Sequence, residues 1–230
     1  MTSPQVVLEV IVCSVADAIE AEQGGAKRLE IIRDFPRGGM TPELELVREV
    51  MNAVSVPVRV MLRESRDYRV TDEREIEQLC ACAREFAALE VDGLVLGFIR
   101  EGQVDVEPSQ RVLSCAPGLK ATFHHAFEET RDAGEAIAKL KTLGQVDRIL
   151  TAGGRGDWPT KMDRLESYQR TANPEIKILA GGGLDIQLLK EIRAKTGISE
   201  FHVGRAARFQ SRIDGPVHSE LVRELVNAIE

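Results

Sequence analysis

The sequence has few cysteines, no concentration of basic residues and no long apolar run, and each of these absences excludes a class of protein. Four cysteines, with no export signal before the first apolar segment, do not indicate a disulfide framework, because cytosolic thiols stay reduced. A formal net charge of −7 without a run of Lys or Arg argues against nucleic-acid binding. No apolar stretch approaches the roughly 18 residues of a membrane span. We therefore expect a cytoplasmic protein with no nucleic-acid or membrane partner.

Two of the cysteines, Cys80 and Cys82, form a C-x-C pair inside a helical pattern. Residues two apart on a helix point about 200° apart, so these two thiols cannot easily hold one metal ion. Free cysteines commonly act as small core residues, and we expect small core or semi-exposed side chains for this pair.

Short apolar segments alternate with longer charged, amphipathic segments along the whole chain. The expected strands cover residues 6–12, 28–32, 58–62, 93–97, 120–124, 148–151, 177–180 and 200–203. The expected helices cover residues 15–23, 41–52, 72–89, 108–115, 131–143, 161–170 and 186–195, with a last helix reaching 229. In the second helix, Thr41 is expected as the cap, with Pro42 in the first helical position.

Eight strand–helix units predict a single (β/α)₈ barrel, a TIM barrel, over residues 1–230. Such barrels commonly run to about 250 residues. Continuous apolar strands, as in residues 177–180, are typical of parallel strands covered on both faces. A doubly wound open sheet is the alternative, but it rarely needs eight such regular units.

Polar residues gather where the expected strands end. Arg63 closes the third strand, His124 the fifth and Thr151 the sixth, and His202 lies near the end of the eighth. His125 follows His124 directly. Because active sites of TIM barrels lie at the C-terminal ends of the strands, these residues are candidates for a site.

Glu9 and Glu30 each interrupt an otherwise apolar strand. The outer face of a barrel strand lies under helices, so both carboxylates are expected to point into the polar upper part of the barrel. A buried carboxylate is costly without a partner, so Arg63 or another cation should lie close. These three residues are either a catalytic group or an ion network that holds the barrel together.

Glycine-rich loops follow the last three expected strands. Phosphate-binding barrels commonly use the loops after strands seven and eight, because exposed backbone N–H groups favour an anion. Arg205 or Arg208 could add a charged contact. The alternative is that the glycines only form tight turns. The candidate ligand-binding residues in these loops are Thr151, Gly153, Gly182, Gly183, Gly204 and Arg205.

Six segments spread over nearly the whole chain form a specific combination. They are residues 24–30 (GGAKRLE), 38–42 (GGMTP), 122–128 (TFHHAFE), 148–154 (RILTAGG), 181–183 (GGG) and 200–202 (EFH). In this order they resemble the CutC family, whose name refers to copper homeostasis. The resemblance implies a TIM barrel and a cytoplasmic homo-oligomer that binds copper. The residues that match the family pattern are Glu9, Glu30, Arg63, Thr122, His124 and His202.

The chain departs from the family pattern at three places. Ile31 and Ile32 occupy the region where the family has a cysteine, and His125 stands where it has arginine. After the third strand, residues 63–67 (RESRD) replace an Arg-Pro-Arg-Gly-Gly segment. Cuprous copper prefers soft thiolate ligands. Without the family cysteine, Cys13 is the only thiol placed to bind Cu⁺ at the mouth.

Three functions remain open from the sequence. The resemblance implies a copper homeostasis protein that binds Cu⁺ through Cys13 with His124 or His202. The residues alone also fit an acid–base enzyme acting on a small phosphorylated or otherwise anionic metabolite. There Glu9 or Glu30 would be the base, His124 the acid or electrophile and Arg63 the orienting cation. The third function is a barrel that only binds a small-molecule ligand, and the fold does not decide among them.

Overall fold

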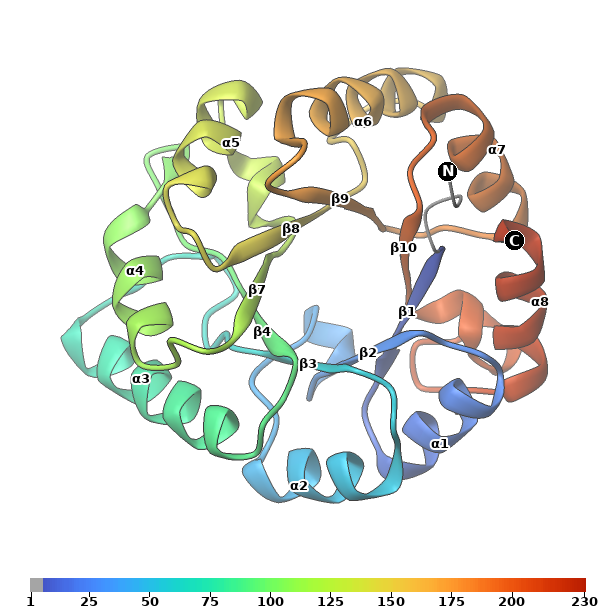
Figure 1. Cartoon of the computed structure of the whole chain (residues 1–230), viewed down its shortest axis with the longest axis horizontal. Coiled ribbons are helices and arrows are strands. Elements are labelled where there is room, and N and C mark those ends of the chain that lie inside the picture. Colours follow the sequence, from blue (N-terminus) through green and yellow to red (C-terminus); the bar gives the residue numbers. More distant parts are fainter. Residues whose placement is uncertain (1–5) are drawn as a thin grey trace.

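The computed structural model describes residues 6–230, in which eight parallel strands form a closed barrel (Figure 1). Around the barrel the strands follow the order β1-β10-β9-β8-β7-β4-β3-β2. The TIM barrel expected from the sequence is confirmed. The barrel strands are β1 (Val7–Val12), β2 (Arg28–Ile31), β3 (Val58–Met61), β4 (Gly93–Leu96), β7 (Lys120–Phe123), β8 (Val146–Thr151), β9 (Lys177–Ala180) and β10 (Glu200–Val203).

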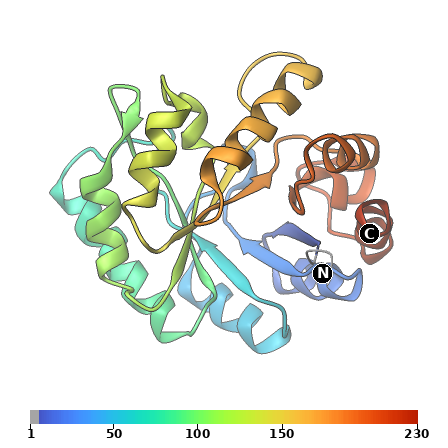
Figure 2. The same cartoon turned by 45° about the horizontal axis from the view of Figure 1, so that its top comes forward.

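Helices surround the strands as an outer ring, which is plain in two views (Figures 1 and 2). The main apolar core lies between these helices and the outward-facing strand residues. Five of the helices are capped by a serine or aspartate side chain that accepts a hydrogen bond from the first turn. The helices are α1 (Val15–Gln23), α2 (Leu44–Ala53), α3 (Glu73–Ala88), α4 (Val106–Ser114), α5 (Ala133–Lys141), α6 (Trp158–Ala172), α7 (Ile186–Thr196) and α8 (Ser219–Ile229).

Two local expectations were wrong. Helix α2 begins at Leu44, and Thr41 does not cap it. The Thr41 hydroxyl instead bonds the backbone N–H and carbonyl of Arg63, so it joins the loop after β2 to the loop after β3. The sequence pattern also missed a short antiparallel hairpin, β5 (Ile99–Arg100) with β6 (Gln103–Val104), which follows β4.

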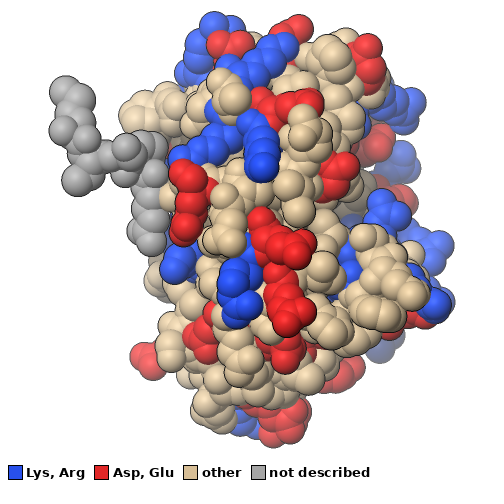
Figure 3. Space-filling view, turned by 90° about the vertical axis from the view of Figure 1, so that its right-hand side faces the viewer, with Lys and Arg blue, Asp and Glu red and all other residues tan. Residues whose placement is uncertain are grey.

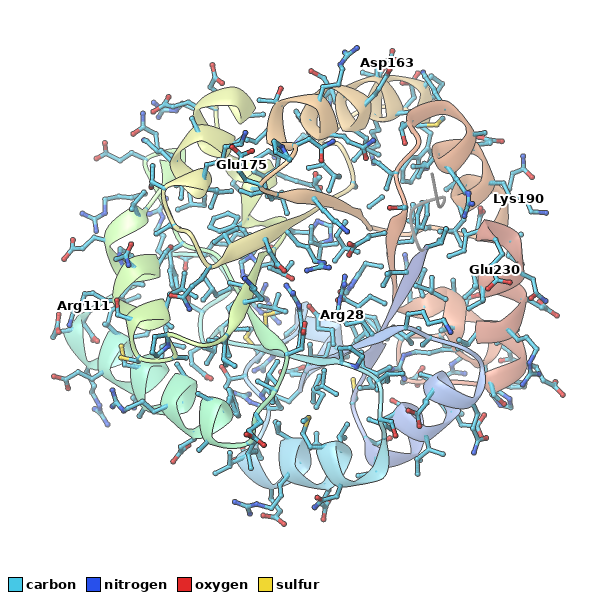
Figure 4. All side chains as sticks on the ribbon, viewed as in Figure 1. Arg28, Arg111, Asp163, Glu175, Lys190 and Glu230 are labelled. Atoms are coloured by element: carbon cyan, nitrogen blue, oxygen red, sulfur yellow. The ribbon has the colours of Figure 1, made fainter. Side chains whose placement is uncertain are left out.

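Charged residues fill the lower part of the barrel interior, the part near the N-terminal ends of the strands. Arg28 points inward from β2, whereas the other residues labelled in Figure 4 lie on the outside. Six ion pairs connect the charged residues of this region into what we call the ionic network: Glu9, Arg28, Arg59, Asp92, Asp147, Arg148 and Glu200. Its members come from β1, β2, β3, β8 and β10 and from the residue before β4.

The outside of the molecule carries both signs of charge. Figure 3 shows acidic and basic side chains interspersed on the face that it presents. Within residues 6–230, no helix combines the length and apolar character needed to cross a bilayer. All four cysteines are free thiols. Cys80 is buried in α3 and Cys82 is half-buried, and burial raises the pKa of both.

Candidate functional site

A cavity of about 480 Å³, which we call the mouth pocket, lies at the C-terminal ends of the barrel strands. Its walls come from the ends of β1, β2, β3, β8 and β10 and from the loops that follow β2, β3, β7, β9 and β10. Its volume lies within the range usual for small-molecule sites. Nine of the residues selected from the sequence line it: Glu30, Arg63, His124, His125, Gly182, Gly183, His202, Gly204 and Arg205.

The remaining candidates lie outside the pocket lining and have other partners. Thr122 is buried deeper in the barrel, where its hydroxyl accepts a hydrogen bond from Arg59 at 2.7 Å. The Thr151 hydroxyl donates to Glu128 at 3.0 Å and accepts from the N–H of Gly153 at 3.0 Å. The Thr151 contacts join the loop after β7 to the end of β8, and both hydroxyls already have partners within the protein.

Glu9 lies beneath the pocket and is fully buried. Its Oε2 atom accepts a hydrogen bond from Arg28, and its Oε1 atom lies 2.7 Å from Nδ1 of His202. Burial opposes ionisation, but Arg28 and His202 hold the pKa of Glu9 well below its usual range. The cation expected beside this carboxylate is therefore Arg28, together with His202, and not Arg63.

His202 connects this buried carboxylate to the pocket. Because Nδ1 faces a carboxylate oxygen it carries a proton, and Nε2 faces Glu30 with 3.7 Å to its Oε2 atom. Burial lowers the pKa of His202, but Glu30 and Glu9 together raise it above its ordinary value. Burial raises the pKa of Glu30 to about 7, against the lowering effect of His202.

Glu9, Glu30 and His202 also satisfy the spacing of a metal site. Each offers one ligand atom, and these three atoms lie within 4.8 Å of one another. Both oxygens of Glu9 already have partners, whereas Oε1 of Glu30 has none among residues 6–230. The two groups best placed to bind an ion from the pocket are therefore Nε2 of His202 and the carboxylate of Glu30.

Arg63 lies in the pocket wall after β3, and its position is fixed from three sides. Thr41 bonds its backbone, and one Nη atom donates to the carbonyl of Arg37 at 2.9 Å. The guanidinium also lies over the ring of Tyr68, with 5.1 Å between Cζ and the ring centroid. The Nε atom has no partner in the described part of the chain.

His124 lies in the same wall, at the end of β7, and its ring has a defined protonation state. Burial, Arg63 and His125 lower its pKa well below the ordinary value, so the ring is neutral. Nδ1 accepts a hydrogen bond from the backbone N–H of Ala126 at 3.2 Å. The single ring proton therefore lies on Nε2, which has no acceptor among residues 6–230. His124 is thus a neutral hydrogen-bond donor.

Cys13 follows β1 but is not part of the pocket lining. Its Sγ atom lies 3.7 Å from a guanidinium nitrogen of Arg208, and it packs beside a small apolar cluster within the barrel. Burial raises the pKa of the Cys13 thiol to about 11. Arg208 itself pairs with Asp17 at 3.1 Å and is buried, so it is not available to an anion in the pocket.

Several residues of the site were not selected from the sequence. Arg28 was assigned only to a strand, because its role depends on which strand lies beside β1. Tyr68 and Asp185 lie in loops, and no sequence pattern marked them. Tyr68 has a left-handed backbone, with φ of 57°, which is uncommon for a non-glycine residue. This unusual conformation marks Tyr68 in the structure, but it could not be read from the sequence.

Comparison with known proteins gives the family. Residues 6–207 match the sequence model of the CutC family. The chain belongs to the CutC family. The copper homeostasis protein cutC homolog of Homo sapiens is 34% identical over 196 residues, which cover 85% of this chain and 71% of that protein. A family protein CutC of Xylella fastidiosa is 30% identical over 210 residues, covering 91% and 78% of the two chains.

A solved structure agrees with this assignment. CutC from Streptococcus agalactiae superposes with a TM-score of 0.80 at 25% identity, over 91% of this chain and 100% of that one. Ile32 and His125, at which the sequence of this CutC-family chain was expected to depart from the family pattern, both line the mouth pocket. His125 also lies 3.2 Å from Glu128, so it helps to hold the loop after β7.

Proposed function

We propose that this chain serves copper homeostasis by binding copper in the mouth pocket. Membership of the CutC family and the name of the human relative support the copper assignment. The observation that carries the location is the orientation of His202. Its Nδ1 atom is held by Glu9 at 2.7 Å, and its Nε2 atom faces Glu30 in the pocket.

The donor atoms fit cupric copper. Imidazole nitrogen and carboxylate oxygen suit Cu²⁺, whereas Cu⁺ prefers thiolate or thioether sulfur. Histidines that bind metals commonly donate their other ring N–H to a carboxylate, which fixes the ring and raises its basicity. Glu9 stands in that relation to His202. Glu30 and His202 would bind the ion directly, and Glu9 would orient His202.

Cuprous copper at Cys13 is the competing arrangement. Thiols bind metals as thiolates, and a thiol with a pKa of about 11 yields its proton reluctantly. Cys13 also lies outside the pocket lining, away from a second thiol. We therefore expect copper to bind through His202 and Glu30 and not through Cys13.

The test is a titration of metal-free protein with Cu²⁺, in parallel with His202→Asn. Asparagine keeps a donor near the Nδ1 position, toward Glu9, but lacks Nε2. His218→Asn is the matched control, because His218 is exposed at the start of α8. We expect one Cu²⁺ per chain, with nitrogen coupling in its paramagnetic resonance spectrum. Binding and coupling should both be lost in His202→Asn and kept in His218→Asn.

Two outcomes would contradict the site. Unchanged Cu²⁺ affinity in His202→Asn would remove His202 as a ligand. Tight anaerobic binding of Cu⁺ that Cys13→Ser abolishes, without binding of Cu²⁺, would place copper at the thiol instead. Failure of both oxidation states to bind would overturn the copper function itself.

The proposal also covers the location of the protein and its oligomeric state. A cytoplasmic location suits four free thiols, because disulfides form mainly in oxidising compartments. A homo-oligomer follows from the family resemblance, and the exposed side chains of Phe209 and Ile213 offer apolar surface for it. Light scattering on the purified chain would measure its mass in solution.

A further inference from the structure

Arg63 differs from the other buried arginines of the structure. Arg28 pairs with Glu9 and Glu200, Arg59 with Asp92 and Asp147, and Arg208 with Asp17. Arg63 is only 6% exposed, yet it forms no ion pair with any acidic residue between positions 6 and 230.

A buried charge without a counterion is costly. The backbone carbonyl of Arg37 satisfies one Nη atom of Arg63, but a carbonyl does not neutralise the charge. Arg63 acts on the Glu30 carboxylate, whose pKa it lowers, but no acidic residue between positions 6 and 230 forms an ion pair with it.

His124 supplies a second unsatisfied donor in the same cavity. The ring is 2% exposed, and its Nε2–H has no acceptor within residues 6–230. Removing a buried donor from water without a partner costs free energy comparable to a lost hydrogen bond. Arg63 lies close enough to His124 to lower its pKa, and both residues contact the Tyr68 ring. The ring centroids of His124 and Tyr68 are 5.0 Å apart.

Both residues line the mouth pocket in which a ligand would lie. A cation and a neutral N–H donor together match an oxyanion, since an ionised acceptor forms the stronger hydrogen bonds. Glu30 supplies an acceptor instead of a donor, because its buried Oε1 atom has no hydrogen-bond donor in the described chain. The complementary ligand carries an oxyanion at one end and a hydrogen-bond donor, such as a hydroxyl group, within reach of Glu30.

We propose that Arg63 and His124 bind the oxyanion of a small metabolite, a phosphate or a carboxylate, in the mouth pocket. This site does not require copper, because neither donor atom belongs to the group that we assign to the ion. It also differs from an anion site built only by the glycine-rich loops after β9 and β10, where Arg205 would supply the positive charge. Arg205 is exposed, whereas Arg63 and His124 are buried.

The experiment is a calorimetric titration of metal-free protein with inorganic phosphate and, separately, with glycolate, a carboxylate that carries a hydroxyl group. Arg63→Gln and His124→Asn remove one donor each. Asparagine keeps an acceptor near the Nδ1 position for the N–H of Ala126. Arg66→Gln, an exposed arginine outside the pocket lining, is the control, and thermal unfolding shows that each variant is folded.

We expect millimolar binding of at least one probe, weakened roughly 10- to 100-fold by Arg63→Gln or His124→Asn and unchanged by Arg66→Gln. The stronger of the two probes identifies the class of oxyanion. Absence of binding by both probes would overturn the proposal. So would loss of binding in Arg205→Gln but not in Arg63→Gln, which places the anion at the glycine loops.

Binding that appears only after Cu²⁺ is added would also overturn it, because the ion would then hold the anion. Copper binding and anion binding are measured separately, so either proposal can fail without the other.

Discussion

The two carboxylate oxygens of Glu9 have different partners. Oε2 faces Arg28, which is part of the ionic network, and Oε1 faces His202, which reaches the pocket. The sequence left open whether Glu9 belongs to a site or to an ion network. In the structure its carboxylate contacts both Arg28 of the ionic network and His202 at the mouth pocket.

Glu9→Gln should therefore change stability and copper binding together. Loss of the charge leaves Arg28 with Glu200 as its remaining carboxylate partner, and breaking a buried pair costs about 3–5 kcal/mol. Loss of a carboxylate behind a metal-binding histidine weakens metal affinity by roughly 10- to 100-fold. Urea unfolding and Cu²⁺ titration of the variant measure the two effects. A stability loss with full copper affinity would restrict Glu9 to the ionic network.

The sequence predicts which side chains line the mouth pocket better than it predicts their hydrogen-bond and ion-pair partners. Glu30, Arg63, His124 and His202 could be selected because polar residues at the ends of barrel strands share one mouth. The partner of Glu9 could not, because it depends on register. Glu9 lies beside Arg28 on β2 and His202 on β10, while Arg63 lies two positions beyond the end of β3.

At the scale of elements, Glu128 joins the loop after β7 to the end of β8. It belongs to the 3-10 helix η2 (His125–Glu129), and its Oε1 atom accepts hydrogen bonds from Ala152 at 2.5 Å and Thr151 at 3.0 Å. Burial opposes its ionisation, but His125, the N–H of Ala152 and the Thr151 hydroxyl lower the pKa of Glu128 to about 2. The ionised carboxylate therefore stabilises this side of the pocket.

The lowered pKa gives this contact a defined pH dependence. Because the folded-state pKa lies below the ordinary value of 4.5, the contribution is complete above pH 4.5 and is lost as the pH falls toward 2. We expect Glu128→Gln to cost about 2 kcal/mol at neutral pH, the usual value of hydrogen bonds to a charged group. Its difference from the parent chain should shrink below pH 4.5. A difference independent of pH in denaturant unfolding would contradict this assignment.

The start of α2 shows where local sequence rules give way to tertiary contacts. A threonine followed by proline is typical of a helix start, but here the Thr41 hydroxyl bonds the backbone of Arg63 instead. The helix then begins three residues later, at Leu44. The contact with Arg63 joins loops 22 residues apart in the chain, so no local pattern could reveal it. The strand positions were predictable because apolar runs are a local property.

At the scale of the whole molecule, the ionic network connects strands from both ends of the chain. Glu200 on β10 pairs with Arg28 on β2 and with Arg148 on β8, and Arg148 continues through Asp147 to Arg59 on β3. Barrel interiors are usually filled by layers of apolar side chains. Here charged residues fill the lower layer, so the barrel depends on keeping each buried charge compensated.

Glu200 is the residue at which this dependence can be measured. It is 2% exposed and pairs with Arg28, Arg148 and Lys177. Glu200→Gln removes the negative charge shared by three cations, and we expect a loss of about 3–5 kcal/mol in the free energy of unfolding. The matched control is Asp214→Asn, since Asp214 pairs with Arg212 at 2.7 Å on the surface, and this variant should unfold at the same urea concentration as the parent.

Comparing the stabilities of the two variants shows whether buried charge or the apolar core holds the strands of the barrel together. If Glu200→Gln unfolds no earlier than Asp214→Asn, the charged layer is neutral for stability, and the outer apolar core alone holds the strands together. A large loss confined to Glu200→Gln would show that the strands far apart in sequence are held at the bottom of the barrel by charge. Arg63 could then stay without an ion pair in the mouth pocket, where a ligand would bind it, since the charges that stabilise the fold lie beneath it.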